Sequence, residues 1–428
     1  MFILKSIIDP IQSEFQKPEY RGKLFVAVLL AILMPAIGSR GSQILCIIRA
    51  IFGFKITSRS FYIMMALPKF PWVRIWQCLW RSIPTPMTDG RLLLAADDSV
   101  NPKTGKRIYG CDYHYDHAAK VNQAKYVWSQ NIVQVGLLKW IHGRFACLPL
   151  IWCFYRLQKS NNKEFKTKIE QVIDMVLAVY RSFKCPVLLV VDNWFASKTL
   201  AKPLGKEMRE SFHLLSRLRT NSKLFDTRIP QYSGRGRPPK YGRCVGNVKS
   251  QGKKCKKKAK KYAVFIYGRK RTVKASSKIF YLKTLGMPVL VVWTYYRKNM
   301  IALFTTDLSL SVEKIIEYYS ARWKQESGFK ELKQDIGSRQ TQARLKNAVT
   351  NHLHFCMMAV TLTWLYAARL VKQPLRHGSH YCQTSFAFSD VRYLIAHGIS
   401  QQGFLKVIFK SRKTPKNNLI SMIIRLVA

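Results

Sequence analysis

The sequence predicts an α/β fold in which a mixed sheet is flanked by helices, with a helical N-terminal domain before it and a strand-rich insertion inside it. Two apolar runs, residues 92–99 and 186–192, each lead into Asp, as expected of buried strands. Two more strand patterns and an amphipathic helix lie between these runs. Residues 319–333 contain strong helix formers and a single Gly, which predicts a further helix.

The chain of 428 residues carries 72 Lys and Arg against 22 Asp and Glu, a formal net charge of +50. Such an excess calls for a polyanionic partner, and nucleic acid is the leading candidate. A hydrophobic content of 48% and ten Trp exclude a disordered basic tail as a description of the whole chain. The ten Cys form no Cys-x-x-Cys pair, which indicates reduced thiols and predicts a cytoplasmic protein.

Residues 1–90 have a helical composition and are expected to form a DNA-binding or dimerisation domain. Their most apolar run, residues 24–34, is too short for a membrane span and is followed by Pro35. We therefore expect a buried helix there and no membrane partner. Residues 39–66 contain four basic side chains, so they are a candidate helix-turn-helix, although pairs of short apolar helices are common without any contact to DNA.

The first apolar run, residues 92–99, predicts a buried strand whose carboxyl end carries Asp97 and Asp98. Adjacent residues of a strand face opposite sides of a sheet, so only one of these carboxylates can reach a site on a given face. A strand-end Asp that caps a turn is the common structural alternative. The residues themselves leave the choice between Asp97 and Asp98 open.

Residues 131–138 and 146–155 predict two more strands. A helix is expected from 162 to 183, where apolar side chains recur at helical spacing. The next strand, 186–191, is wholly apolar and is followed by Asp192. The order is therefore three strands, a helix and a strand that presents the second Asp, and residues 212–219 predict one further core strand.

Residues 220–306 predict a basic, strand-rich insertion. Arg235 and Arg237 belong to an Arg-Gly-Arg-Pro segment that resembles the hooks placed in narrow A·T-rich minor grooves. Residues 253–261 are a Lys-rich run suited to phosphates. The alternative for both segments is a solvated, mobile loop.

Strands within this insertion are expected at 278–284, 289–296 and 301–306. Trp293 and Tyr295 are candidates to stack on an unpaired base of a nucleic acid. Packing in the core is the more ordinary role of such aromatic side chains.

The predicted helix at 319–333 gathers unusual chemistry on one face. Tyr319, Arg322, Glu326 and Lys333 stand at offsets of 0, 3, 7 and 14, which superpose on one side of a helix. The cations suit phosphates, and the carboxylate can share a divalent metal. The alternative is a solvated helix with ion pairs along its surface.

This spacing, Tyr-x2-Arg-x3-Glu-x6-Lys, together with the two upstream Asp, resembles the signature of bacterial insertion-sequence transposases with an Asp-Asp-Glu (DDE) triad. The resemblance covers residues 91–370 and implies a ribonuclease-H-like sheet in which the first and fourth strands are neighbours. It implies that Asp97, Asp192 and Glu326 bind two Mg²⁺ ions, for which Mn²⁺ can substitute. The family pattern of Asp, any residue, then Ser or Thr favours Asp97 over Asp98, and both stay candidates.

The resemblance also implies an activity and partners. The activity is metal-dependent cleavage of double-stranded DNA at the terminal inverted repeats of an element, followed by strand transfer into target DNA. Tyr319, Arg322, Lys330 and Lys333 would contact that DNA, and the chain would act as a homodimer on DNA, associated with the bacterial nucleoid. Two alternatives remain: an inactive or domesticated DNA-binding protein, and a structure-specific nuclease of the same fold.

The C-terminal part of the chain is less informative. Residues 347–370 predict an apolar helix, interrupted by Thr361 and Thr363, that packs on the sheet and does not cross a membrane. Residues 371–428 form a basic, weakly patterned tail. A dimerisation segment and a DNA-contacting tail are both open for it.

Overall fold

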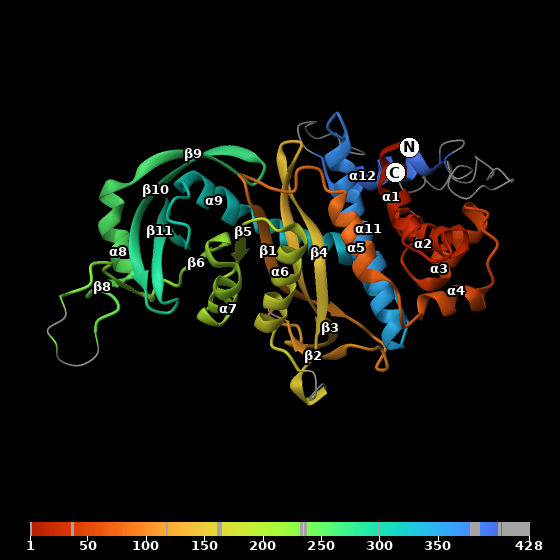
Figure 1. Cartoon of the computed structure of the whole chain (residues 1–428), viewed down its shortest axis with the longest axis horizontal. Helices are drawn as coiled ribbons and strands as arrows, with labels where there is room; N and C mark the ends of the chain where they lie inside the picture. Colours follow the sequence, from red (N-terminus) through yellow and green to blue (C-terminus); the bar gives the residue numbers. More distant parts are fainter. Residues whose placement is uncertain are drawn as a thin grey trace.

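The computed structural model of the chain describes residues 2–35, 38–116, 119–160, 165–231, 234, 238–297, 299–376, 386–400 and 404. Figure 1 shows an elongated molecule with the N-terminal helices at one end and the strand-rich insertion at the other. The strands that carry Asp97 and precede Asp192 lie between these two ends.

Twelve strands of the described residues form one mixed sheet. Its main path has the order β2-β3-β1-β5-β6-β12-β11-β10-β7-β8, with β4 paired to β3 and β9 paired to β10. The strands are β1 Leu92–Pro102, β2 Cys111–Tyr115, β3 Tyr126–Ile141, β4 Arg144–Tyr155, β5 Val187–Val191, β6 Phe212–Arg217, β7 Lys223–Phe225, β8 Cys244–Asn247, β9 Lys260–Ile266, β10 Arg269–Leu282, β11 Met287–Tyr296 and β12 Asn299–Thr305. The core strands and the insertion thus share one sheet.

The middle of the sheet brings the two Asp-bearing segments together. β1 is parallel to β5, with Ala96 beside Val191, and β5 is parallel to β6. On its other side β1 is antiparallel to β3, which continues into β4 through the tight turn at Gly143. The predicted adjacency of the first and fourth core strands is confirmed. The resulting order β4-β3-β1-β5-β6 is consistent with a ribonuclease-H-like arrangement.

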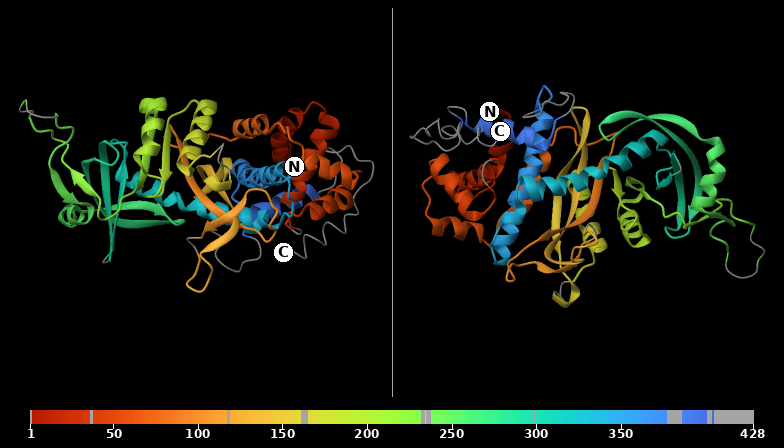
Figure 2. Two further views of the ribbon diagram at one scale, coloured as in Figure 1. Left: turned by 90° about the horizontal axis from the view of Figure 1, so that it is seen from below. Right: turned by 180° about the vertical axis from the view of Figure 1, so that it is seen from behind.

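Helices cover both faces of the core strands. On one face α6 and α7 pack in the same hydrophobic cluster as Leu92, Leu94 and Ala96. On the other face α9 packs in the same cluster as Leu93 and Ala95. α9 leads into α10, and the two helices run across the sheet on the side seen from behind, in the right-hand view of Figure 2. These helices are α6 Lys168–Phe183, α7 Lys198–Met208, α9 Val312–Ala321 and α10 Trp323–Lys330.

The start of α6 differs from the sequence prediction, which placed it at residue 162. Residues 161–164 lie outside the described part, and the helix begins at Lys168. The reason is a capping box: Thr167 Oγ1 accepts a hydrogen bond from the Glu170 backbone, and the Glu170 carboxylate accepts one from the Thr167 N–H at 2.8 Å.

The predicted N-terminal helical segment contains five α-helices: α1 Phe2–Ser13, α2 Lys23–Leu33, α3 Gly41–Cys46, α4 Ser58–Met65 and α5 Trp72–Arg81. Every residue of α2 is buried, as expected for the most apolar run of this segment. The ring of Phe25 in α2 lies 4.8 Å from that of Phe355 in α11 (Lys346–Arg369), so the N-terminal helices share a core with the C-terminal part of the chain. Among the residues that the structure describes, no helix is long and apolar enough to cross a membrane.

α11 packs on the sheet, as predicted. Its Thr361 hydroxyl donates to the Pro149 carbonyl of β4 at 2.5 Å, and Trp80 of α5 donates to the Leu150 carbonyl at 3.1 Å. A last described helix, α12 (Phe388–Ser400), packs beside α11 and α2. Its buried Arg392 donates hydrogen bonds to the carbonyls that end α2, Ile32, Leu33 and Met34. Most of the predicted tail beyond α12 lies outside the described residues.

The insertion contains more regular structure than its composition suggested. The Lys-rich run 253–261, for which a mobile loop was one alternative, spans the end of α8 (Val248–Cys255), a 3₁₀ turn and the start of β9. β10 begins at Arg269, nine residues before the predicted strand. The reason is cross-strand pairing: Arg269–Ala275 of β10 pairs with β9, a partner that the charged sequence did not reveal. Arg235 and Arg237 lie outside the described residues.

The helix predicted at 319–333 is present but is not uniform. α9 and α10 meet at Arg322, and a π-helical turn, Glu331–Asp335, follows α10. The Glu331 carboxylate is buried and accepts a hydrogen bond from Trp364 Nε1 of α11 at 2.9 Å. The π turn shifts the direction of later side chains, so Lys333 does not follow ideal α-helical spacing from Tyr319.

Candidate active site

Asp97 and Asp192 lie at the same level of the sheet, Asp97 within β1 and Asp192 just beyond the end of β5. The last pair of the parallel β1–β5 ladder is Ala96 beside Val191, and each is followed directly by Asp. Because carboxyl ends of parallel strands meet at one edge, both acids lie near the same point of the sheet. Asp192 Oδ1 accepts hydrogen bonds from the backbone N–H groups of Trp194 at 2.9 Å and Phe195 at 3.2 Å, which fix the orientation of this carboxylate.

Asp97 and Asp98 point to opposite faces of the sheet. Asp98 Oδ2 accepts a hydrogen bond from Lys168 Nζ of α6 at 2.6 Å and another from Asn131 Nδ2 of β3 at 3.0 Å. Asp97 instead faces the helix pair α9–α10, where its Oδ2 lies 3.4 Å from Arg322 Nη1. The sheet therefore separates the two sequence candidates. Asp97 lies on the face covered by α9 and α10, which meet at Arg322 within the signature residues 319–333.

Arg322 joins two of the predicted acidic ligands. Its Nη1 pairs with Asp97, and its Nη2 lies 3.1 Å from Glu326 Oε1. The guanidinium lies 5.7 Å from the centre of the Tyr319 ring. The side chain is buried, and its Nε has no hydrogen-bond partner among the described residues. A buried cation thus occupies the space between the carboxylates.

The electrostatics of this cluster favour a cation. Burial raises the pKa of Asp97 to about 7; Arg322 and the Asp98 backbone oppose this rise, and the charges of Asp98 and Asp192 add to it. Burial acts to lower the pKa of Arg322, but Tyr319 and three carboxylates outweigh it, so the pKa is raised and the guanidinium stays charged. The surrounding carboxylates thus keep Arg322 charged, whereas burial favours the neutral form of Asp97.

Lys333 reaches the same face from the π turn. Its ammonium donates a hydrogen bond to the hydroxyl of Ser99, which lies two residues beyond Asp97 and therefore on the same side of β1. Burial, and then the charge of Arg339, lower the pKa of Lys333 to about 8. Lys330 is exposed at the end of α10. The structure thus brings Arg322, Glu326 and Lys333 to β1 and leaves Lys330 on the surface.

The donor set fits a hard divalent cation, although no metal-binding cluster is formed. Within the described ranges, no group of three His, Cys, Asp or Glu side chains is spaced to hold a metal ion. Asp97, Asp192 and Glu326 offer oxygen ligands only, which Mg²⁺ and Mn²⁺ prefer.

The insertion contributes a cavity beside Tyr319. A space of about 410 Å³ is bordered by Tyr319 and Ser320 of the signature helix and by side chains of β9–β12, including Arg271 and Tyr295. Trp293, the other aromatic candidate, is fully buried and donates to the Val248 carbonyl at 3.1 Å, so it packs in the core. Of the two aromatics, Tyr295 alone lines this cavity.

Several residues around the site were not singled out from the sequence. Ser99 had a usable signal, because its spacing of two from Asp97 places both on one face of a strand. The sequence held no signal for Lys168 and Asn131, since their hydrogen bonds to Asp98 depend on where α6 and β3 lie in the fold. Gln325 is fully buried and donates to the Gln134 carbonyl at 3.3 Å, which fixes α10 against β3.

Comparison with known proteins agrees with the class of protein that these features indicate. A family model described as the transposase DDE domain matches residues 155–362. The matched region contains Asp192, Arg322 and Glu326, whereas Asp97 lies before it. No curated protein matches the chain. The match supports a DDE transposase, an enzyme class whose partner is DNA.

Proposed function

We propose that the chain is a DNA transposase that cleaves double-stranded DNA at the ends of a mobile element and transfers the freed 3′ end into target DNA. The observation that carries the proposal is that Asp97 and Asp192 follow one ladder of neighbouring parallel strands, while Arg322, where α9 and α10 meet, pairs with both Asp97 and Glu326. The transposase DDE domain match over 155–362 supports the same class.

Asp97, Asp192 and Glu326 are the residues that would hold Mg²⁺, with Mn²⁺ as a substitute. The bound ions would polarise the scissile phosphate and stabilise charge on the attacking and leaving oxygens of an in-line displacement. Asp98 is the weaker candidate, because its carboxylate is engaged by Lys168 and Asn131 on the opposite face.

The chain's own cations orient the DNA around these acids. Arg322 is buried, charged and within reach of both Asp97 and Glu326, so its unpartnered Nε is suited to donate to a phosphate oxygen. Lys333 has a lowered pKa of about 8, which keeps it largely protonated at neutral pH, where it can hold a second phosphate. Tyr319 and the exposed Lys330 complete the predicted set of DNA contacts.

The insertion supports DNA binding next to the acids. β9 and β10 carry exposed basic side chains at Lys260, Lys261, Arg269, Lys270, Arg271, Lys274 and Lys278. The cavity beside Tyr319, with Tyr295 in its wall, has the size and aromatic lining for one unpaired base. Arg235 and Arg237 remain proposed minor-groove contacts. Pairing two element ends calls for a homodimer on DNA, and the DNA substrate calls for a cytoplasmic, nucleoid-associated enzyme.

The test is cleavage of a labelled duplex that carries the gene's flanking DNA, in the presence of Mg²⁺. Wild type should cut at the element boundary, and Glu326→Gln should bind the duplex with nearly the same affinity and fail to cut. Glu207→Gln, the same substitution at an exposed position of α7, should cut like wild type. Equal loss of binding and cleavage in Glu326→Gln would show that Glu326 is structural.

The same assay separates the two alternative functions. Binding without cuts in either Mg²⁺ or Mn²⁺ would favour an inactive or domesticated DNA-binding protein. Cuts that depend on DNA structure, and not on the flanking sequence, with no joined products, would favour a nuclease of the same fold. Boundary cuts followed by products joined to a target plasmid are the result that the transposase proposal expects.

A further inference from the structure

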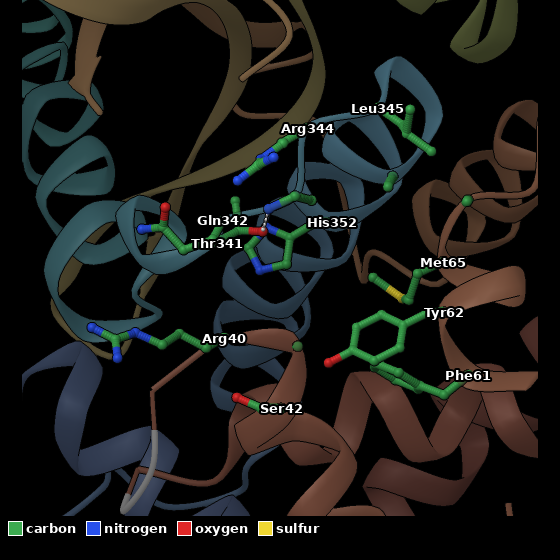
Figure 3. Close-up of a pocket in the computed structure, with 14 residues that line it drawn as sticks. Arg40, Ser42, Phe61, Tyr62, Met65, Thr341, Gln342, Arg344, Leu345 and His352 are labelled. Atoms are coloured by element: carbon green, nitrogen blue, oxygen red, sulfur yellow. Dashed lines mark hydrogen bonds between the residues drawn. The ribbon is translucent and has the colours of Figure 1, made fainter. Parts of the chain in front are cut away.

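A groove distinct from the carboxylates lies between the N-terminal helices and the segment that leads into α11. One cavity of about 430 Å³ is bordered by the start of α3, by α4 and by residues 341–345. A second, of about 320 Å³, is bordered by residues 105–108 and shares Gln342 and Arg344 with the first. We call the two cavities together the connector groove. In Figure 3 the Tyr62 hydroxyl points toward its centre, and Arg344 comes from the opposite wall.

The charge of the connector groove is of one sign. None of the described residues that line either cavity is Asp or Glu. The lining cations, all exposed, are Arg40, Lys106, Arg107 and Arg344. His352 contributes no charge at neutral pH, because burial lowers its pKa to about 4, although the hydrogen bond between its Nε2 and the Ser39 carbonyl at 2.7 Å opposes this shift. Such a lining is complementary to a polyanion.

The floor of the groove is apolar and aromatic. The Tyr62 side chain is 49% exposed, and the ring of Phe61 lies 5.1 Å from it in an edge-to-face arrangement. Met65 and Leu345 also line this cavity. A phosphate ion alone makes no favourable contact with an apolar surface, whereas the sugar or base of a nucleotide packs well on an exposed aromatic ring. Cations at the rim and an aromatic floor together fit a nucleotide strand.

The groove is fixed relative to the candidate active site. Lys103, just beyond β1, donates from Nζ to the carbonyls of Ser338 and Arg339 at 3.0 Å each. The Arg344 carbonyl accepts a bond from the Tyr109 N–H at 3.1 Å. Because Lys103 follows Asp97 by six residues of extended chain, this anchor lies about 20 Å from the carboxylates.

We propose that the connector groove binds one strand of the element-end duplex about six base pairs from the cut. Arg40, Lys106, Arg107 and Arg344 hold successive phosphates, and Tyr62 packs against a sugar or base. The span follows from about 20 Å of β1 and about 3.4 Å of duplex per base pair. The inference rests on DNA being the substrate of the proposed transposase, and it assigns a second contact region far from the acids.

The experiment measures binding of two labelled duplexes carrying the gene's flanking DNA, by fluorescence anisotropy over a series of salt concentrations. One duplex extends 15 base pairs to the element side of the cut and the other extends 4. On the long duplex the double variant Arg40→Gln/Arg344→Gln should lower the slope of log K against log salt by about 1.8, since each lost phosphate contact removes about 0.9. On the short duplex the slope should match wild type.

Three controls keep this test specific. Arg181→Gln, at an exposed position of α6, should leave the slope unchanged. Tyr62→Ala should weaken binding of the long duplex about 5- to 100-fold, as expected for one lost stacking contact, with no change of slope. Tyr62→Phe keeps the aromatic ring and should bind the long duplex with wild-type affinity. Circular dichroism melts establish that each variant is folded.

An unchanged slope in a folded double variant, or an equal change on both duplexes, would overturn the proposal. Its failure is separable from that of the proposed function. If wild type cuts at the element boundary and the double variant keeps the wild-type slope, the groove inference alone is wrong. If the double variant loses slope on the long duplex only and wild type cuts no DNA, the transposase proposal fails, and DNA binding by the connector groove stands without its distance from a cut.

Discussion

Glu331 is the side chain whose ionisation should couple most strongly to folding. It is buried at the end of α10, and its carboxylate accepts a hydrogen bond from Trp364 Nε1 at 2.9 Å. Burial raises the pKa of Glu331 from 4.5 to about 8, although the Trp364 bond and the charges of Arg144 and Lys324 oppose the rise. At pH 6 the folded chain therefore holds a proton on Glu331 that the unfolded chain has released.

The direction of the pH effect follows from this difference. The folded state binds more protons than the unfolded state between the two pKa values, so stability from Glu331 is greatest at low pH and is lost as the pH rises through about 8. With these pKa values the loss between pH 6 and pH 9 is about 3 kcal/mol. Glu331→Gln keeps an acceptor for Trp364 and has no proton to lose, so this contribution should be absent.

The assay is urea unfolding of wild type, Glu331→Gln and the exposed control Glu207→Gln at pH 6, 7.5 and 9. Between pH 6 and pH 9 wild type and the control should each lose about 3 kcal/mol more unfolding free energy than Glu331→Gln. Groups that titrate in all three proteins cancel in this comparison. Parallel stability curves for wild type and Glu331→Gln would refute the reasoning, because they would show that folding leaves the ionisation of Glu331 unchanged.

Three other substitutions test the site and its support. Asp97→Asn should abolish DNA cleavage in Mg²⁺, whereas Asp98→Asn should retain it because Asp98 pairs with Lys168 on the opposite face; cleavage by both variants would contradict the assignment of the first strand. Arg392→Met should lower the free energy of unfolding by about 3 kcal/mol, since the carbonyls that end α2 lose their buried donor. A loss in urea unfolding no larger than that of the exposed control Arg181→Met would contradict that role.

The strands that present Asp97 and Asp192 could be predicted because a strand buried on both faces has an uninterrupted run of apolar residues. Residues of β1 and β5 pack in two hydrophobic clusters, one on each side of the sheet, so each run is apolar throughout up to its acid. The adjacency of the two strands came from the family resemblance, because the order of elements alone does not determine which strands pair.

The choice between Asp97 and Asp98 needed the structure, because strand alternation separates the two faces without saying which face meets α9–α10. The ordered Lys-rich run was missed for a different reason. Its charged side chains are exposed and carry no apolar period, so the pairing of Lys260 and Lys261 in β9 with β10 depends on backbone hydrogen bonds that composition does not record. The connector groove was equally hidden, since its walls come from four distant parts of the chain.

The single continuous sheet has a mechanical consequence for any DNA bound across it. β12 of the insertion pairs with β6 of the core through Leu303–Thr305, and Leu214 and Thr306 add two bonds at the same seam. A hinge between the insertion and the core would have to break this ladder, so the basic strands keep a fixed offset from the acids. When a duplex does not match that offset, the DNA has to bend or untwist, because the protein does not change shape. Flexible base steps near the cut would then be favoured without any side chain reading them.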